Sequence, residues 1–295
     1  MNDIARLKLQ DNSKRIESIL DRLLSRENFQ CKSHNDRLIS AMRYAILNGG
    51  KKLRSFLLVE CAALFEFYDP VVLQIGAAIE CIHCYSLIHD DLPSMDDGHI
   101  RRGKPTVHIK YDEATAILSG NSLLTYAFEI IFSPKTKLED KIRCELAFSL
   151  SCSSGAKGML GGQMMDVQDE YPDENNPFIV PEMKTGALMR FACEAGAIIA
   201  NASQEDKIRL RNFGNNLGII FQLVDDILDF KSNTHKVDKK SMKNATNKKN
   251  CLIKIKGEQW IKQEIDKQTN SAIDILSCYG KKSQPLIEFA RFLSS

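Results

Sequence analysis

The chain has few of the residues that interrupt helices. Its 295 residues include only 16 glycines and 8 prolines, and no stretch alternates apolar and polar residues as a half-buried strand does. Long helices are therefore expected to dominate, and we predict an all-α fold of about ten helices. The apolar periodicity predicts helices over residues 3–25, 34–47, 56–67, 71–89, 112–132, 139–165, 185–200 and 204–230, with further helical patterning over 251–292.

Large charge excess and long apolar runs are also lacking. The formal net charge is +2, so no global field favours a nucleic-acid partner. We find no uninterrupted apolar run of about 18 residues and expect no membrane span. Residues 1–30 lack the apolar core of a signal peptide, and we expect a cytoplasmic protein.

The nine cysteines form no disulfide framework. Their odd number and their apolar, helical surroundings are typical of a reducing compartment, where Cys serves as a small hydrophobic residue. Cys81 and Cys84 form a C-x-x-C pair without a second pair to accompany it. One turn of a buried helix therefore explains this pair better than a zinc or redox site does.

Acidic residues cluster where an apolar helix is expected to end. Asp90 and Asp91 close the helix predicted over 71–89, Pro93 breaks it, and Asp96 and Asp97 follow. The carboxyl end of a helix is already negative, so these acids repel one another unless a cation lies among them. Oxygen ligands without a rhythm of His or Cys favour Mg²⁺ over zinc.

A second acidic cluster lies inside the helix predicted over 204–230. Asp229 follows Asp225 by four residues and Asp226 by three, so all three can share one surface with Gln222, one turn before Asp226. Taken alone, this cluster is also explained by a solvated acidic surface.

Basic residues accompany both clusters. Lys51 and Arg54 begin a helix after two glycines, where cations oppose the helix dipole, and Arg101 and Arg102 follow the first acidic cluster. A basic cluster is often only solvated. Together with Lys184 and two acidic clusters, however, these residues predict a diphosphate site in which carboxylates hold Mg²⁺ and guanidinium groups bind oxyanions.

This combination resembles the short-chain trans-isoprenyl diphosphate synthases, and most closely the bacterial farnesyl diphosphate synthases (geranyltranstransferases). The resemblance spans roughly residues 35–250. The matching motifs are Gly49-Gly50-Lys51-x-x-Arg54, His83, Asp90-Asp91-x-x-x-x-Asp96, Arg101-Arg102-Gly103, Gly162-Gln163-x-x-Asp166, Lys184-Thr185, Gln222 and Asp225-Asp226-x-x-Asp229.

The resemblance implies one polyprenyl synthase domain over residues 1–295, with helices around a central cavity, usually as a homodimer. It implies a Mg²⁺-dependent prenyltransferase that condenses isopentenyl diphosphate with geranyl and dimethylallyl diphosphate to farnesyl diphosphate. The reaction is ionisation, condensation and elimination, with several Mg²⁺ ions per site.

The resemblance also assigns roles to individual residues. The implied metal ligands are Asp90, Asp96 and Asp225. The implied isopentenyl diphosphate site is Lys51, Arg54, His83 and Arg102. The implied allylic diphosphate site is Arg101, Lys184, Thr185, Gln222 and Lys239. The implied catalytic set is Asp90, Asp91, Asp225, Arg101 and Lys184.

Product length in this family depends on the side chain below the first acidic motif. Tyr85 lies five residues before Asp90, deeper on the same predicted helix. An aromatic residue there, with two extra residues between the aspartates, resembles the bacterial fifteen-carbon pattern. A synthase of geranylgeranyl length is the alternative, and ordinary core packing also explains Tyr85.

The segment 231–250 departs from the family. It is rich in lysine and poor in apolar residues, and we predict a mobile basic loop. Lys239 and Lys249 match family lysines, whereas the usual glycines, acid and threonine are missing. Ser55 also replaces a common proline, and Gly98-His99 interrupts a longer acidic run.

Three alternative functions follow from particular residues. The altered loop leaves open a non-catalytic homologous subunit, although such a subunit has no reason to keep mutually repelling acids. His89-Asp90 and His83 suggest an HD-type phosphohydrolase, which would need more His ligands. Ser154-x-x-Lys157 with Lys184-Thr185-Gly186 suggests a serine β-lactamase, but its Lys-Thr-Gly belongs on a strand.

Overall fold

The structure, a computed structural model, describes residues 3–29, 36–168, 178–235 and 256–294. Its contacts divide the chain into two compact units. Residues 2–150 and 195–203 form what we call the N-terminal unit, and residues 151–194 and 204–295 form the C-terminal unit. The prediction of one domain over 1–295 stays a prediction.

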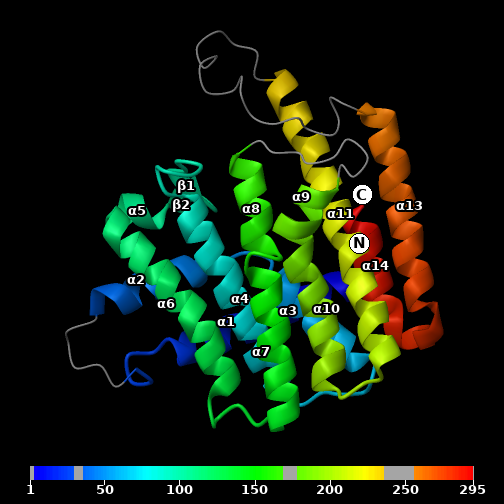
Figure 1. Ribbon diagram of the computed structural model, residues 1–295, viewed down its shortest axis with the longest axis horizontal. Coiled ribbons are helices and arrows are strands. Elements are labelled where there is room, and N and C mark those ends of the chain that lie inside the picture. The colour runs from blue at the N-terminus through cyan, green and yellow to red at the C-terminus, as the bar shows by residue number, and fades with distance from the viewer. Residues whose placement is uncertain (1–2, 30–35, 169–177, 236–255, 295) are drawn as a thin grey trace. The chain divides into compact units, whose positions relative to one another are not determined.

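The N-terminal unit is built on one apolar helix. Its elements are α1 (Asp3–Leu23), α2 (Asp36–Ile46), α3 (Leu53–Ala63), α4 (Val71–Asp90), β1 (Ile100–Arg101), β2 (Lys104–Pro105), α5 (Val107–Lys110), α6 (Glu113–Phe132) and most of α7 (Asp140–Ser154). Helix α4 packs most extensively on α6 and also contacts α1, α2 and α3 (Figure 1). Residues on every side of α4 are buried, as expected of a helix that is apolar all round.

The C-terminal unit is organised around the longest helix. Its elements are α8 (Met159–Val167), α9 (Ile179–Pro181), the π-helical turn η1 (Glu182–Gly186), most of α10 (Ala187–Ile199), α11 (Gln204–His235), α13 (Glu258–Leu276), the 3₁₀ segment η2 (Ser277–Ser283) and α14 (Gln284–Leu293). Helix α11 packs on α13, η1 and α14 (Figure 1).

The all-α prediction is confirmed, with local differences. The helix predicted over 139–165 is two helices, α7 and α8, because the chain turns at Gly155 and Gly158. The predicted loop begins later than residue 231, since α11 continues to His235. The rest of that segment lies outside the described residues.

Two described helices, α4 and α6, are long and apolar enough to cross a membrane by length and composition. The most apolar window of α4 is 78% buried and that of α6 is 50% buried. Burial of this extent is typical of the core helices of a folded protein, so these helices are weak evidence for a span.

The short hairpin β1–β2 was not predicted. Ile100 pairs with Pro105, and Arg101 with Lys104. At the turn, Arg102 and Gly103 have φ of 53° and 74°. Two successive residues with positive φ match the tight turns that suit two-residue hairpins. A two-residue strand is too short for an alternating pattern, so periodicity could not reveal it.

Candidate active site

The first acidic motif forms a closed loop at the carboxyl end of α4. The Asp96 backbone N–H donates to the Asp90 carbonyl oxygen at 2.9 Å, and the Gly98 N–H donates to the Asp91 carbonyl oxygen at 3.1 Å. The loop thereby returns Asp96 to the level of Asp90. Asp96 is exposed and Asp90 is half-buried, so the two predicted metal ligands of this motif lie on one turned segment.

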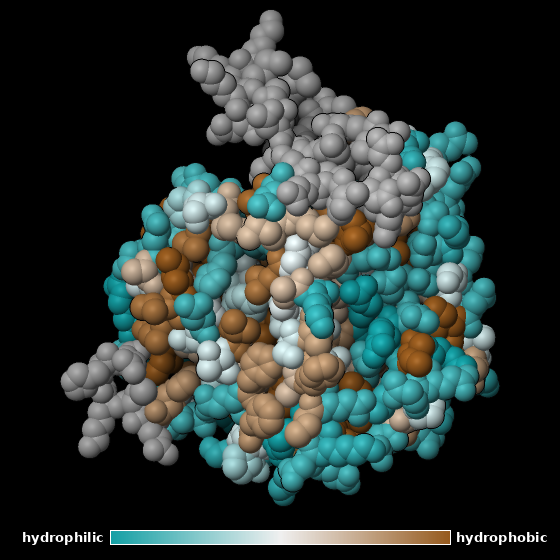
Figure 2. Space-filling view, in the orientation of Figure 1, coloured by the Kyte–Doolittle hydropathy of each residue, from teal (hydrophilic) through white to brown (hydrophobic). Residues whose placement is uncertain are grey.

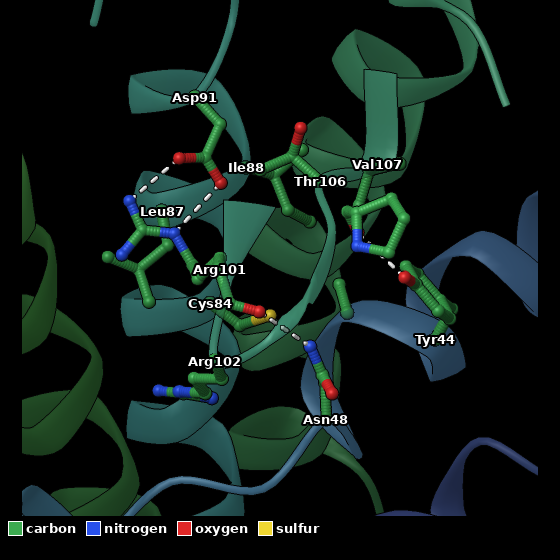
Figure 3. Close-up of a pocket in the computed structure, with 12 residues that line it drawn as sticks. Tyr44, Asn48, Cys84, Leu87, Ile88, Asp91, Arg101, Arg102, Thr106 and Val107 are labelled. Atoms are coloured by element: carbon green, nitrogen blue, oxygen red, sulfur yellow. Dashed lines mark hydrogen bonds and ion pairs between the residues drawn. The ribbon is translucent and has the colours of Figure 1, made fainter. Parts of the chain in front are cut away.

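Asp91 has a different position from its neighbour Asp90. Its side chain is 7% exposed and accepts from Arg101 Nε at 2.8 Å and from an Arg101 terminal nitrogen at 2.7 Å. Figure 3 shows this two-pronged pair between the end of α4 and the hairpin. Asp91, predicted as catalytic, is therefore placed to position Arg101.

The charge of Arg101 is stabilised by the acidic loop. Its pKa lies above the usual value, chiefly because of the hydrogen bonds to Asp91, while burial opposes the shift. The charges of Asp91, Asp90 and Asp96 raise the pKa further. The Arg101 guanidinium is held by Asp91, and the charges of Asp90 and Asp96 favour its protonated form.

Arg102, next on the hairpin, points to another segment. Its guanidinium donates to the Gly49 carbonyl oxygen at 2.7 Å. A Cβ on Gly50 would lie 2.6 Å from the Arg102 guanidinium carbon, so glycine at position 50 leaves room for this side chain. The loop before α3 and the hairpin thus present Lys51 and Arg102 on neighbouring surfaces.

Arg54 and His83 lie beneath this basic surface. The Arg54 Nε is buried and has no hydrogen-bond partner in the part of the chain that the structure describes. Burial lowers the pKa of Arg54. The charge of Glu80 partly offsets this lowering, and the charge of Arg102 adds to it. The pKa of His83 lies well below its usual value because of burial, followed by the charges of Arg54, Arg102, Lys52 and Arg101. All four predicted residues of the isopentenyl site belong to this unit.

Lys52 and Ser55 brace the start of α3, and sequence patterns had given them no role. The Lys52 ammonium donates to the carbonyl oxygens of Ile46 and Gly49 at 2.8 and 3.2 Å, joining α2 to α3. The Ser55 N–H donates to Glu80 at 3.1 Å. A proline at this position would have no N–H and could not make this bond.

Tyr85 lies in the core of the N-terminal unit. It is 2% exposed, its hydroxyl has no hydrogen-bond partner among the described residues, and its ring meets His89 edge-on at 5.8 Å. Burial, followed by the charge of Asp90, raises its pKa to about 12. His89 Nε2 lies 3.2 Å from the Ile117 carbonyl oxygen, a backbone contact that weakens the phosphohydrolase alternative.

The C-x-x-C pair is core, as predicted. Cys81 is 0% and Cys84 is 7% exposed. Burial is the main reason why the pKa of Cys81 is well above its usual value and that of Cys84 is raised to about 12. Such thiols are poor nucleophiles and poor metal ligands.

In the C-terminal unit, η1 carries two of the predicted allylic-site residues. Lys184 Nζ donates to Asp166 on α8 at 2.6 Å. Thr185 Oγ1 lies 3.3 Å from Gln222 Oε1, and the Gln222 amide donates to Asp226 at 3.1 Å. Asp166, a motif residue without a predicted role, is the partner that positions Lys184.

Glycines allow this close assembly. A Cβ on Gly162 would lie 2.3 Å from the Lys184 backbone nitrogen, and one on Gly218 would lie 2.4 Å from the Gly186 Cα. Helices α8 and α11 therefore approach η1 with no side chain between the backbones. A π-helical turn at such a point is frequently functional.

Gln163 on α8, a motif residue without a predicted role, is a further candidate for the site. It is 7% exposed, and both of its amide atoms lack a hydrogen-bond partner among the described residues. A buried amide is costly to leave unpaired, so the site has capacity for a polar ligand atom. Asp225 lies half-buried on α11. The Asp229 side chain and Lys239 are outside the described residues.

A small cavity lies behind the hairpin. Its volume is about 30 Å³, and its lining includes Tyr44, Asn48, Leu87 and Val107 (Figure 3). Asn48 donates to the Arg101 carbonyl oxygen at 3.3 Å, and Tyr44 donates to the Pro105 carbonyl oxygen at 2.6 Å. The cavity has room for water but not for a diphosphate, so it supports the hairpin from behind.

Known proteins are similar to this chain in sequence and in fold. The chain is 35% identical to the farnesyl diphosphate synthase of Bacillus subtilis over 88% of this chain and 89% of that protein. It is also 35% identical to geranylgeranyl pyrophosphate synthase 4 of Arabidopsis thaliana over 86% of this chain and 70% of that protein.

Among solved structures, an FPP/GFPP synthase from Zymomonas mobilis in its apo form superimposes with a TM-score of 0.89 and 34% identity, covering 100% of both chains. The model of the polyprenyl synthetase family matches residues 35–285. The chain belongs to the polyprenyl synthetase family.

Proposed function

We propose that this protein is a Mg²⁺-dependent prenyltransferase that condenses isopentenyl diphosphate with geranyl diphosphate, and with dimethylallyl diphosphate before it, to form farnesyl diphosphate. The observation that carries the proposal is the buried Arg54 Nε, which has no hydrogen-bond partner among the described residues and lies beside other cations. An unpaired donor of this kind is costly without an anion to accept from it. The farnesyl diphosphate synthases among the relatives support the substrate class.

The isopentenyl diphosphate site is proposed at the basic surface of the N-terminal unit. Arg54 and Arg102 supply forked donors suited to phosphate oxygens, and Lys51 adds an exposed ammonium. His83 has a depressed pKa and so meets the ligand as a neutral ring, able to donate one hydrogen bond. Burial is the main cause of the lowered pKa values of Arg54 and His83, and neighbouring cations lower them further; a bound anion would offset the repulsion from these cations.

The residues at the acidic motifs fit Mg²⁺. Asp90 and Asp96 are brought to one loop by the backbone hydrogen bond between them, and both offer the hard oxygen ligands that Mg²⁺ prefers. Asp225 would serve from α11. When bound, several Mg²⁺ ions supply Lewis-acid stabilisation of charge on the allylic diphosphate.

The allylic diphosphate is proposed to contact Arg101, Lys184, Thr185 and Gln222, with Lys239 as a further ligand. Asp91 holds Arg101 and Asp166 holds Lys184, so two cations are pre-oriented before the ligand arrives. Pre-orientation matters because these groups then stabilise negative charge on the departing diphosphate without reorganising.

The chemistry needs no protein nucleophile. The allylic carbon–oxygen bond breaks, and its electron pair leaves with the diphosphate held by Arg101 and Lys184. The isopentenyl double bond attacks the allylic cation, and the proton lost from the adduct goes to the released diphosphate. Apolar residues around Tyr85 exclude water that would quench the cation.

Product length is proposed to depend on Tyr85. Its buried aromatic ring, one and a half turns below Asp90 on α4, is placed to limit the growing chain at fifteen carbons. Synthesis of the geranylgeranyl length is the second candidate, favoured by the Arabidopsis relative of that name.

We also propose a homodimer in the cytoplasm. Ile109 on α5 and Ile117 and Leu118 on α6 are 48%, 43% and 56% exposed. Figure 2 shows apolar side chains at the surface over this part of the N-terminal unit. Contact with a second copy would remove this apolar area from water.

The decisive experiment is incubation with isopentenyl diphosphate, Mg²⁺ and each allylic diphosphate in turn, followed by chromatography of the products. We expect farnesyl products from geranyl and dimethylallyl diphosphate, and none after chelation of the metal. Arg54→Gln should raise the KM for isopentenyl diphosphate about tenfold or more, as expected for loss of a charged hydrogen bond, and leave the allylic KM unchanged. No condensation with any allylic partner would favour the non-catalytic subunit.

A further inference from the structure

Three potential metal ligands converge beside the first acidic motif, outside the predicted Mg²⁺ ligands. One ligand atom each from Asp97, His99 and His108 lies within 4.8 Å of the other two. Asp97 and His99 end the acidic loop before β1, and His108 lies on α5 just after β2. Tertiary structure thus joins residues on both sides of the hairpin.

His108 has the environment of an oriented ligand. The Thr106 hydroxyl donates to the Gly98 carbonyl oxygen at 2.7 Å and lies 3.2 Å from His108 Nδ1. Because the hydroxyl has one proton and a carbonyl only accepts, Thr106 must accept from Nδ1–H. In the neutral ring, this leaves the lone pair on Nε2. Metal-binding histidines commonly have their second nitrogen held in this way.

The lone-pair nitrogen of His108 is also buried and unsatisfied. His108 is 9% exposed, and its Nε2 has no hydrogen-bond partner among the residues that the structure describes. An orphan buried nitrogen requires an explanation. A metal ion at the centre of the three ligands accounts for it.

The distances permit a bound ion after small movements. His99 Nε2 and Asp97 Oδ1 are 3.5 Å apart, close to the separation of roughly 3.4 Å between ligands around tetrahedral zinc with bonds of about 2.0–2.1 Å. The His99 and Asp97 side chains are 65% and 60% exposed, so they can move toward buried His108 without disturbing the core.

We propose that Asp97, His99 and His108 form a second metal site, selective for a divalent transition ion of the zinc class. Two imidazoles and one carboxylate suit zinc and its neighbours better than Mg²⁺, which prefers oxygen. Three protein ligands leave a position for water. The ion would tie the end of the acidic loop to α5 and thereby brace the hairpin that carries Arg101 and Arg102. This site is independent of the prenyl-transfer proposal.

The test is zinc binding to the full chain in excess Mg²⁺, measured by equilibrium dialysis and zinc X-ray absorption. Excess Mg²⁺ occupies oxygen-only sites, so we expect one tightly bound zinc with imidazole scattering. His99→Asn, an exposed substitution that should leave folding intact, is expected to weaken zinc binding at least 100-fold. Thr106→Val, which removes the hydroxyl that orients His108 together with its bond to the Gly98 carbonyl oxygen, should weaken it about 10- to 100-fold.

His89→Asn is the matched control, because His89 is the nearest other described histidine to the acidic loop in sequence and is not one of the three ligands. Its zinc affinity should equal that of the wild type. No zinc binding in excess Mg²⁺, or binding unaffected by His99→Asn, would overturn the proposal. Loss of zinc in His89→Asn alone would also overturn it and place the ion on α4.

Discussion

At the scale of single residues, the basic surface combines several cations with a histidine that stays uncharged. His83 lies near Arg54 and Arg102, and its pKa is well below the usual value because of burial and these charges. The uncharged ring is what allows so many cations to share one surface. A bound anion would offset the repulsion among these cations.

The lowered pKa of His83 predicts a pH dependence of stability. Because the folded-state pKa of His83 is below the unfolded value of about 6.5, the unfolded state takes up the proton first as pH falls. The contribution of His83 to the free energy of unfolding should therefore be constant above pH ~6.5. Below that pH, the free energy of unfolding should decrease by up to about 1.4 kcal/mol per pH unit. Denaturant unfolding of the wild type and of His83→Gln between pH 7.5 and 5.5 measures this decrease in the free energy of unfolding.

In His83→Gln the decrease should be smaller, because glutamine does not titrate. Inorganic diphosphate should also reduce the decrease in the free energy of unfolding of the wild type at low pH, because a bound anion favours protonated His83. Identical pH profiles for the two proteins would refute this account.

Tyr85 is the residue that we expect to limit product length. Tyr85→Ala removes a buried ring and should shift products from fifteen carbons to twenty or more, as resolved by chromatography. Substitution of a buried aromatic residue by alanine also costs about 3–5 kcal/mol of stability, so the assay belongs at low temperature. Tyr126→Ala, which removes another buried tyrosine of this unit, is the control, and its products should keep their length.

At the scale of elements, glycines decide how closely segments approach. Gly49 and Gly50 both have positive φ, 69° and 104°, yet only a Cβ at position 50 would clash with Arg102. Alanine at position 49 therefore introduces backbone strain alone, whereas alanine at position 50 introduces backbone strain and also displaces the Arg102 side chain.

We therefore expect Gly50→Ala and Gly49→Ala each to lose about 1–3 kcal/mol of stability from strain. Only Gly50→Ala should also raise the KM for isopentenyl diphosphate by about tenfold or more, because it displaces the Arg102 guanidinium. Thermal unfolding and steady-state kinetics on both variants measure these effects. An equal rise of KM in Gly49→Ala would show that loop strain alone is responsible.

The contact between α8 and η1 gives a second prediction at this scale. The Asp166 and Lys184 side chains are 8% and 28% exposed, so Asp166→Asn should destabilise the protein by about 2–4 kcal/mol. It should also raise the allylic KM and lower kcat, since Lys184 loses its orientation.

Glu194→Gln provides the comparison, because Glu194 is 7% exposed and pairs with Arg211 in the same unit. It should lose stability and keep both KM values. If both variants change the allylic KM equally, the role of Asp166 is structural rather than one of positioning.

At the scale of the whole molecule, the exposed apolar residues of α5 and α6 predict self-association. Sedimentation at micromolar concentration should give twice the mass of the chain, 33.3 kDa. Leu118→Asp places a charge among these residues and should produce the monomer. Leu7→Asp, at a site on α1 that is 60% exposed, should remain dimeric. A monomeric wild type would contradict this prediction.

Much of the candidate active site could be proposed from the sequence because its residues are close together along the chain. Asp90, Asp96 and Arg101 lie within one short segment, and helix period places Gln222 and Asp226 on one face. Their residue types and spacing carry the chemistry without reference to the rest of the chain.

The sequence by itself thus determined the helical class, the buried C-x-x-C turn and the acidic and basic motifs, because periodicity and residue chemistry are local properties. Only the tertiary structure decided that Asp91 holds Arg101, that Asp166 holds Lys184, and that His99 and His108 meet across a hairpin. These pairings depend on left-handed turn residues and on glycines that let backbones touch. Such through-space contacts leave no period in the sequence.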